Sequence, residues 1–162
     1  GPLGVTRGGD GRLTMDFPTD EIVKVGLTDP LVSCFDAPPV EAYRGKTDFL
    51  LIFKSEDEIR GMKFDLGRIA MLDARGVIVS ARGRDCDFVS RFFAPRSGVD
   101  EDPVTGSAHT TLTPYWSGVL KKDELSAIQL SARRGYIQCR NRGARTEVSG
   151  RAVLYMRGEL YV

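Results

Sequence analysis

Alternating apolar and polar residues predict short strands along most of the chain. The segments with this signal, or with a compact apolar run, are residues 13–17, 48–53, 77–81, 87–93, 127–132, 135–139 and 152–156. Segments 77–81 and 87–93 flank a polar turn, which predicts a hairpin. Glycine-containing turns separate the later segments, as expected for a sheet of short strands.

Helical spacing is limited to four segments. Residues 21–25 follow an acidic residue that can cap a short helix, and residues 55–58 resemble a capping box. Residues 66–71 have the spacing of one or two helical turns. In residues 107–120, apolar side chains recur at helical intervals with almost no charge between them, which predicts a helix buried on most sides. Pro114 should bend this helix or remove one backbone hydrogen bond.

The order of elements is strands, one apolar helix and then strands, without an internal repeat or a linker. This order predicts an α+β fold in a single domain over residues 5–162. The length of 162 residues suits one domain with a hydrophobic core. Residues 1–4, Gly-Pro-Leu-Gly, resemble the remnant of a cleaved tag, although natural sequence can match it too.

Composition excludes several classes of protein. The hydrophobic fraction is 41%, the charged fraction 28% and the net charge +1, which excludes wholesale disorder, collagen-like repeats and coiled coil. No apolar run reaches the roughly 20 residues that span a bilayer, and no N-terminal segment resembles a signal peptide. The near-zero net charge argues against a dedicated nucleic-acid or membrane-surface protein.

The three cysteines, Cys34, Cys86 and Cys139, are widely spaced and odd in number. This spacing excludes a disulfide scaffold and a standard zinc knuckle. It favours buried or half-buried free thiols in a reducing cytoplasm.

Arginines gather near the C-terminus. Between Ser131 and Arg157 there is one acid, Glu147, against seven arginines: Arg133, Arg134, Arg140, Arg142, Arg145, Arg151 and Arg157. Such an excess can bind phosphate, nucleic acid or a protein partner. We favour the simpler interpretation that these side chains decorate solvated strand edges and turns, where arginine discourages edge-to-edge pairing.

The segment with the clearest chemistry is residues 101–109, which opens the apolar helix and contains the one histidine of the chain. The first N–H groups of a helix have no partner within it. The amides of Gly106, Ser107 and Ala108 can therefore bind a carboxylate or phosphate, helped by the helix dipole. Asp102 can hydrogen-bond a substrate amine or hydroxyl, and the Ser107 hydroxyl can donate to the bound anion.

A purely structural interpretation fits the same residues. Thr105 or Ser107 would cap the helix, Asp102 and Pro103 would make the turn, and His109 would pack in the first helical turn. The segment lacks the lysine and glycine spacing of a phosphate-binding loop and the pattern of a hydrolase nucleophile elbow. No histidines or carboxylates have metal-ligand spacing, so no metal is implied.

A combination of motifs runs through the chain from residue 87 onward. Residues 87–95, Asp-Phe-Val-Ser-Arg-Phe-Phe-Ala-Pro, precede residues 101–109, Glu-Asp-Pro-Val-Thr-Gly-Ser-Ala-His. With Pro-Tyr-Trp at 114–116, Ser-Ala-Arg at 131–133 and Ser-Gly-Arg-Ala-Val at 149–153, the chain resembles the phenazine biosynthesis F protein family. The resemblance runs from about residue 13 to the end and covers the second half of a usual member.

The resemblance implies a diaminopimelate-epimerase-like domain, in which a mixed, barrel-like sheet wraps around one central apolar helix. Family members have two such domains, with the active site in the cleft between the two helix N-termini. In the phenazine pathway they isomerise a dihydro-hydroxyanthranilate without a cofactor, and a glutamate moves a proton between ring carbons. The catalytic positions implied here are Asp102 and Ser107. The substrate-binding positions implied here are Thr105, Gly106, Ser107, Ala108 and His109.

The family's catalytic glutamate and its Gly-His-Ala-Thr loop belong to the first domain, and neither is found in this chain. Glu21, Glu41 and Glu56 have no matching sequence context. We therefore expect the C-terminal domain of a cofactor-independent isomerase or epimerase, which binds a small carboxylate-bearing substrate and is inactive alone. Its expected partners are that carboxylate substrate, the family's N-terminal domain and a second copy in a homodimer, with no nucleic acid and no membrane. The alternative is a non-catalytic module that binds a carboxylate, or a partner through residues 131–157.

Overall fold

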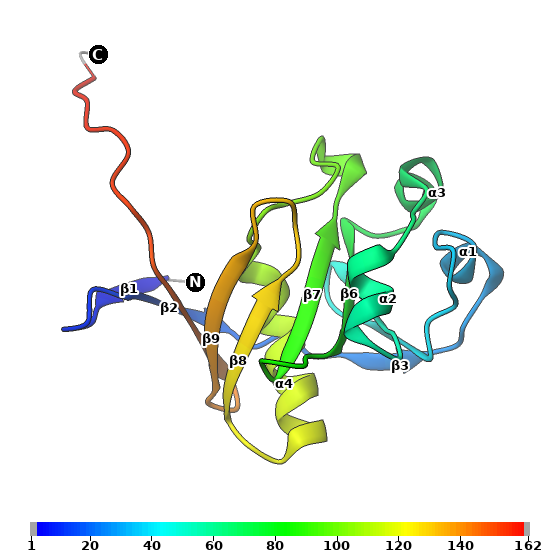
Figure 1. Ribbon diagram of the computed structural model, residues 1–162, viewed down its shortest axis with the longest axis horizontal. Coiled ribbons are helices and arrows are strands. Elements are labelled where there is room, and N and C mark those ends of the chain that lie inside the picture. The colour runs from blue at the N-terminus through cyan, green and yellow to red at the C-terminus, as the bar shows by residue number, and fades with distance from the viewer. Residues whose placement is uncertain (1–2, 161–162) are drawn as a thin grey trace.

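The structure, a computed structural model, describes residues 3–160, in which a ten-stranded mixed sheet dominates (Figure 1). The strands are β1 (Gly4–Arg7), β2 (Leu13–Pro18), β3 (Val23–Val25), β4 (Glu41–Arg44), β5 (Asp48–Ile52), β6 (Gly76–Arg82), β7 (Phe88–Phe93), β8 (Glu124–Gln129), β9 (Gly135–Asn141) and β10 (Arg145–Gly150). The helices are α1 (Asp29–Val32), α2 (Glu56–Gly61), α3 (Leu66–Met71), the short 3-10 helix η1 (Pro95–Ser97) and α4 (Gly106–Leu120). The fold is therefore α+β, as the order of elements predicts.

The strand order is β1-β2-β10-β9-β8-β7-β6-β5-β4-β3. Two neighbouring pairs are parallel, β5 with β6 and β7 with β8. Parallel neighbours need a crossover connection, and helices usually supply it. Helices α2 and α3 lie in the first crossover, and η1 and α4 lie in the second. The second crossover places the start of α4 directly after the loop that leaves β7.

The two faces of the central strands pack against different helices. Val77 and Val79 of β6 belong to one apolar cluster with Ile59 of α2 and Ile69 of α3. Ile78, between them on β6, belongs to a second cluster with helix α4. Successive side chains of a strand point to opposite faces, so burial on both sides explains the continuous apolar runs of these strands.

Helix α4 is mostly buried, as its apolar pattern predicts. It contacts strands β2, β5, β8, β9 and β10. The Trp116 ring stacks on Phe88 with centroids 5.7 Å apart, and its Nε1 donates to Ser80 Oγ at 2.9 Å. Pro114 lies inside the helix without ending it. These contacts anchor α4 in the core and fix where its N-terminus lies.

Most of the predicted elements are confirmed. The hairpin is β6 with β7, and residues 13–17, 48–53 and 135–139 correspond to β2, β5 and β9. The expected short helices at 55–58 and 66–71 are α2 and α3. In α2 the Ser55 hydroxyl accepts a hydrogen bond from the Glu58 amide. Local sequence signals were sufficient for these elements.

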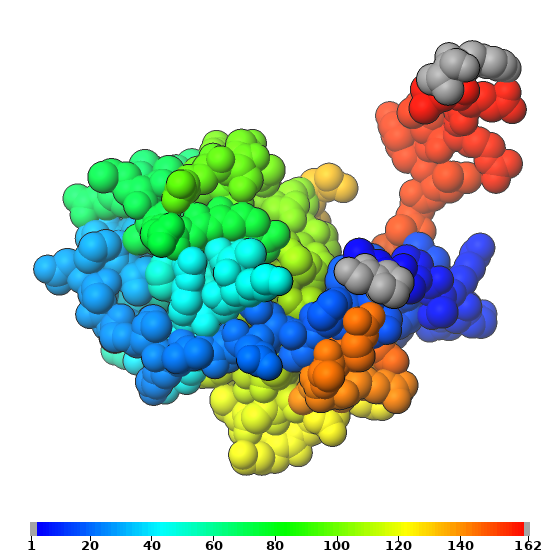
Figure 2. Space-filling model, turned by 180° about the vertical axis from the view of Figure 1, so that it is seen from behind, coloured from blue at the N-terminus to red at the C-terminus, as the bar shows by residue number. Residues whose placement is uncertain are grey.

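Three predicted elements were wrong in type or place. Residues 21–25 form no helix: Val23–Val25 is the edge strand β3, because pairing with β4 outweighs the local helix signal. The strand predicted at 127–132 ends at Gln129, since the turn back into β9 begins at Leu130. Residues 152–156 form no strand, because no neighbouring strand pairs with them, and the segment from Arg151 to Leu160 projects from the body (Figures 1 and 2).

The three thiols are free, as predicted. Cys34 and Cys139 are buried and Cys86 is half-buried. Burial raises the pKa of the Cys139 thiol to about 12, so it stays protonated at neutral pH.

No helix within residues 3–160 is long and apolar enough to cross a membrane. Of the expected tag remnant at residues 1–4, the first two residues lie outside the described residues, and Gly4 begins β1.

Candidate functional site

The loop between β7 and α4 is held by a largely buried ion pair. Arg91 of β7 donates from Nε to Glu101 Oε1 at 2.7 Å and from Nη2 to Oε2 at 3.0 Å. Its guanidinium lies 5.0 Å and 5.1 Å from the ring centroids of Phe64 and Phe93. A bidentate pair of this kind has little freedom to rotate. It therefore fixes the loop one residue before Asp102.

Gln129, at the end of β8, holds the next part of the loop. Its Nε2 donates to the Asp102 carbonyl oxygen at 2.7 Å and to Thr105 Oγ1 at 3.1 Å, and its Oε1 accepts from the Thr105 amide at 2.8 Å. The side chain is fully buried. A single amide group thus ties both ends of the turn that leads into α4.

The N-terminus of α4 is left open. Thr105 occupies the N-cap position, but its side chain makes no capping hydrogen bond. Its hydroxyl instead donates to Asp102 Oδ2 at 2.6 Å. Within residues 3–160, the amides of Gly106, Ser107 and Ala108 have no hydrogen-bond acceptor outside the helix. The capping interpretation therefore does not describe this turn, and the donors stay available to an anion.

Ser107 lies on the side of α4 that faces the start of β5 and β6. Its Oγ accepts a hydrogen bond from Arg75 Nη2 at 3.1 Å. Arg75 in turn donates to the buried Asp48 carboxylate. The hydroxyl of Ser107 is thus held at the open end of the helix by a cation.

His109 is fully buried in the first turn of α4. Its Nδ1 lies 2.7 Å from the Thr105 carbonyl oxygen, and a carbonyl only accepts, so Nδ1 carries the hydrogen. Burial lowers the pKa of His109 to about 4, against the raising effect of this hydrogen bond. The ring is therefore neutral at neutral pH, with Nε2 as an acceptor that has no partner in the described part of the chain. The structural interpretation of a fully satisfied histidine fails at Nε2.

A cavity of about 910 Å³ opens beside this helix terminus. Of the predicted site residues, Thr105, Gly106 and His109 line it, while Asp102, Ser107 and Ala108 do not. Apolar side chains of the surrounding strands also line it: Leu13, Met15, Ile137 and Val148. Four arginines contribute to its lining: Arg12, Arg133, Arg134 and Arg151. The cavity suits an anionic molecule with an apolar body.

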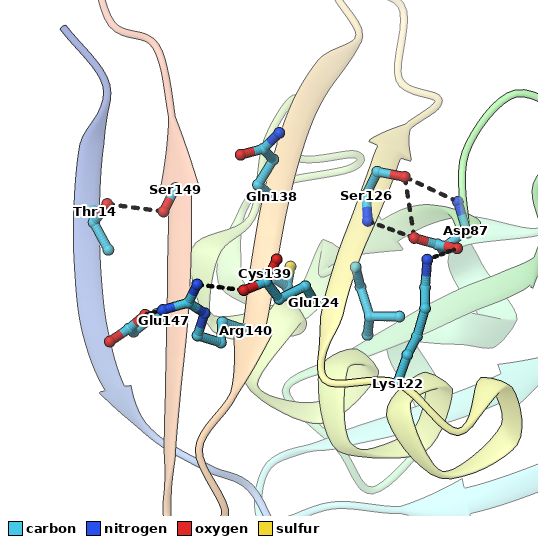
Figure 3. A pocket seen from close by; sticks show the side chains of 11 residues that line it. Thr14, Asp87, Lys122, Glu124, Ser126, Gln138, Cys139, Arg140, Glu147 and Ser149 are labelled. Carbon is cyan, nitrogen blue, oxygen red and sulfur yellow. Dashed lines mark hydrogen bonds and ion pairs between the residues drawn. The ribbon is translucent and has the colours of Figure 1, made fainter. Parts of the chain in front are cut away.

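A second pocket, of about 440 Å³, lies over β8, β9, β10 and β2, with charged groups across its surface (Figure 3). There Arg140 pairs with Glu124 and Glu147, and Asp87 pairs with Lys122 at 2.7 Å. Each of these charged side chains therefore has an ion-pair partner within the pocket. Cys139, whose thiol burial keeps protonated, and Asp87, whose pKa is lowered by its hydrogen bonds to Lys122 and Ser126 against the opposing effect of burial, also line it, and neither arrangement leaves a reactive group without a partner.

The acids of the sheet neutralise part of the arginine-rich segment. Arg142 donates to Glu147 at 2.8 Å, and Arg145 donates to both carboxylate oxygens of Asp16. Arg140 is paired as described above. Ordered ion pairs on strands agree with the interpretation as solvated strand surface, and they weaken the case for a broad basic docking face.

Sequence reasoning missed Arg91, Gln129 and Arg75, the three side chains that position this turn. Arg91 and Gln129 each lie in an apolar strand segment, and a buried polar residue needs a partner. That signal was readable in the sequence, but the identity of the partners was not. In residues 3–160, no three His, Cys, Asp or Glu side chains gather as a metal site would require.

Comparisons with known proteins agree on one family. The family model described as "Phenazine biosynthesis-like protein" matches residues 13–158. Two proteins of Pseudomonas aeruginosa, each named an uncharacterized isomerase, are similar to the chain. One is 47% identical over 93% of this chain and 58% of its own length, and the other is 44% identical over 100% of this chain and 62% of its own length.

A solved structure has the same fold. The crystal structure of a phenazine biosynthesis protein of the PhzF family from Enterococcus faecalis matches 100% of this chain and 62% of its own chain, with a TM-score of 0.92 and 36% identity. The chain therefore spans about three fifths of the length of these relatives.

Proposed function

This chain belongs to the phenazine biosynthesis-like protein family, and we propose that it supplies the substrate-anion half of a cofactor-independent isomerase or epimerase site. The observation that carries the proposal is the open N-terminus of α4, where Gly106, Ser107 and Ala108 present amides without an acceptor in residues 3–160. Relatives named as isomerases support the reaction class.

The substrate carboxylate binds at this terminus. Backbone N–H groups that point at one oxygen anion form charge-assisted hydrogen bonds, which are roughly twice as strong as neutral ones. The positive end of the α4 dipole adds to the attraction and does not depend on the net charge of the protein. The Ser107 hydroxyl donates to the same anion, and Asp102 accepts from a neighbouring amine or hydroxyl of the substrate.

The role of this chain in the reaction is orientation. A carboxylate fixed at α4 presents the adjoining carbon to a base in one geometry, and such positioning lowers the barrier of a proton shift. His109 is unsuited to serve as that base, because burial lowers its pKa to about 4. Glu41 is engaged by Lys24, Tyr43 and Tyr115. We propose that the base is the glutamate of the family's first domain and that this chain alone does not turn over substrate.

The exposed apolar side chains of the C-terminal segment are evidence that a partner polypeptide binds there. The segment contains five apolar side chains that are 75% to 98% exposed: Val153, Leu154, Tyr155, Met156 and Leu160. Contiguous exposed apolar side chains usually mark an interaction surface. We propose that the family's N-terminal domain covers this segment and completes the cleft. A curled sheet around α4, a homodimer and a cytoplasmic location are predictions that accompany this model.

An NMR titration tests the anion site: two-dimensional 1H–15N correlation spectra of the chain are recorded while sodium benzoate is added. Benzoate offers a carboxylate on a flat apolar ring. We expect saturable shifts of the amides of Gly106, Ser107 and Ala108, and weaker binding in Ser107→Ala. The control Ser33→Ala removes the hydroxyl of the exposed residue that caps the C-terminus of α1. This variant should bind benzoate as the wild type does. Shifts that are absent at α4, or that saturate elsewhere, would overturn the proposal.

A further inference from the structure

Arg75, the residue directly before β6, is held by Asp48, the first residue of the parallel neighbouring strand β5. Its Nε donates to Asp48 Oδ1 at 2.9 Å, and its Nη2 donates to Oδ2. Asp48 is buried, with 2% of its surface exposed, and also accepts from Thr47 Oγ1 at 3.1 Å. The guanidinium lies 5.4 Å from the Phe92 ring centroid. A bidentate pair with one buried partner and a ring beneath it holds the arginine plane in one orientation.

The same guanidinium reaches the open end of α4. Besides its bond to Asp48, Nη2 donates to Ser107 Oγ at 3.1 Å. A serine hydroxyl has one hydrogen to donate and two lone pairs to accept with. Because Arg75 occupies a lone pair, the Ser107 hydrogen must point elsewhere, and no acceptor for it lies within residues 3–160. The hydroxyl is therefore a polarised donor without a protein partner.

We propose that Arg75, held by Asp48, is a positioning residue that orients the Ser107 hydroxyl as a donor toward the anion bound at the α4 N-terminus. This inference rests on the proposed function and goes beyond it, because it assigns the donor's orientation to two residues outside the helix. The effect is directional, since Asp48 balances the charge of Arg75. It favours a ligand group that only accepts, such as a carboxylate, over one that must donate at this position.

A double-mutant cycle separates this role from a purely structural one. The dissociation constant of sodium benzoate is measured for the wild type, Ser107→Ala, Arg75→Met and the double variant. We expect each single variant to weaken binding by about tenfold, the scale of one charge-assisted hydrogen bond. In the Ser107→Ala background, Arg75→Met should weaken binding no further, because it acts through the hydroxyl.

Two further variants control for charge and for folding. Arg84→Met removes an exposed arginine that pairs with Asp57, changes the net charge by the same amount and should bind benzoate as the wild type does. Arg75→Lys keeps the cation but cannot donate to Asp48 twice and to Ser107 once in the same plane. It should therefore behave as Arg75→Met does, and it keeps the test usable if the methionine variant is poorly folded.

The outcomes distinguish this inference from the proposed function. If Ser107→Ala binds as the wild type does, or benzoate does not shift the α4 amides, the proposed anion site itself fails. If Ser107→Ala weakens binding but Arg75→Met does not, or if the two effects multiply in the double variant, the positioning role is overturned and the anion site stands. Full recovery of wild-type affinity in Arg75→Lys also overturns it, because charge alone would then suffice.

Discussion

Replacing Gln129 with leucine tests the idea that one buried side chain holds the turn into α4. The change keeps the approximate volume and removes the three hydrogen bonds to Asp102 and Thr105. It leaves the Thr105 amide and the Asp102 carbonyl without their partner inside the protein. The Thr105 hydroxyl keeps its bond to Asp102 Oδ2, so the turn loses part of its support and not all of it.

The expected loss of stability follows from the two buried groups that lose their partner, the Thr105 amide and the Asp102 carbonyl. A buried polar group left unsatisfied costs about 1–3 kcal/mol, and Gln129 is 0% exposed. Leucine is less costly to bury than an amide, and the turn can relax toward water. We therefore expect Gln129→Leu to lower the free energy of unfolding by about 2–4 kcal/mol.

Urea unfolding followed by fluorescence measures this loss, because the single tryptophan, Trp116, is buried in the core. Hydrogen exchange of the Thr105 amide provides a local measurement and should accelerate more than exchange in β6. The control Gln138→Leu makes the same change at an exposed position of β9 and should cost at most about 0.5 kcal/mol. A loss below about 1 kcal/mol, with unchanged exchange at Thr105, would refute the argument.

Three other changes test separate parts of the structure. Gly76→Ala should destabilise the protein by about 1–3 kcal/mol in urea unfolding, because the new Cβ would lie 2.6 Å from Phe92 Cζ. As pH falls from about 6.5 toward 4, the unfolded chain protonates His109 before the folded one does, so the free energy of unfolding should fall by up to about 3 kcal/mol. When the chain is fused to the segment that a relative carries outside the matched region, Asp102→Ala and Ser107→Ala should each slow proton exchange at the substrate by about 10²-fold or more.

Each of these predictions has a matched comparison. Gly61→Ala places a Cβ where nothing lies within 4 Å, so it should be close to neutral, and an equal loss at both glycines would contradict the packing argument. His109→Gln cannot titrate, and its unfolding free energy should lack the component between about pH 6.5 and 4. For the two site variants, Ser33→Ala should leave exchange unchanged. Full exchange in Asp102→Ala and Ser107→Ala would favour a non-catalytic module.

The sequence was informative where the structure depends on local signals. The β6–β7 hairpin followed from two apolar runs around a polar turn, and α4 followed from helical spacing without charges. Residues 21–25 were misassigned because edge pairing with β4 is invisible in the local pattern. Residues 152–156 have strand-like composition, but a strand needs a neighbour, and none pairs with them in residues 3–160.

The candidate site also has a part that the local sequence predicts and a part that only the fold assembles. The open helix start, with Gly106 and Ser107, was identified from the segment itself. The residues that shape it come from three other places in the chain: Arg75 before β6, Arg91 on β7 and Gln129 on β8. Only the fold brings them together. Thr105 likewise does not cap the helix, because its hydroxyl donates to Asp102 and accepts from Gln129.

Deuterium incorporation tests the central claim, that this chain is one half of an isomerase site, most directly. A dihydro-hydroxyanthranilate, the substrate that the family resemblance implies, is incubated in deuterated water with the 162-residue chain and, separately, with the chain fused to the segment that the 47% identical Pseudomonas aeruginosa relative carries outside the matched region. We predict exchange at a ring carbon with the fusion and none above background with the chain alone. Robust exchange by the chain alone would contradict the account.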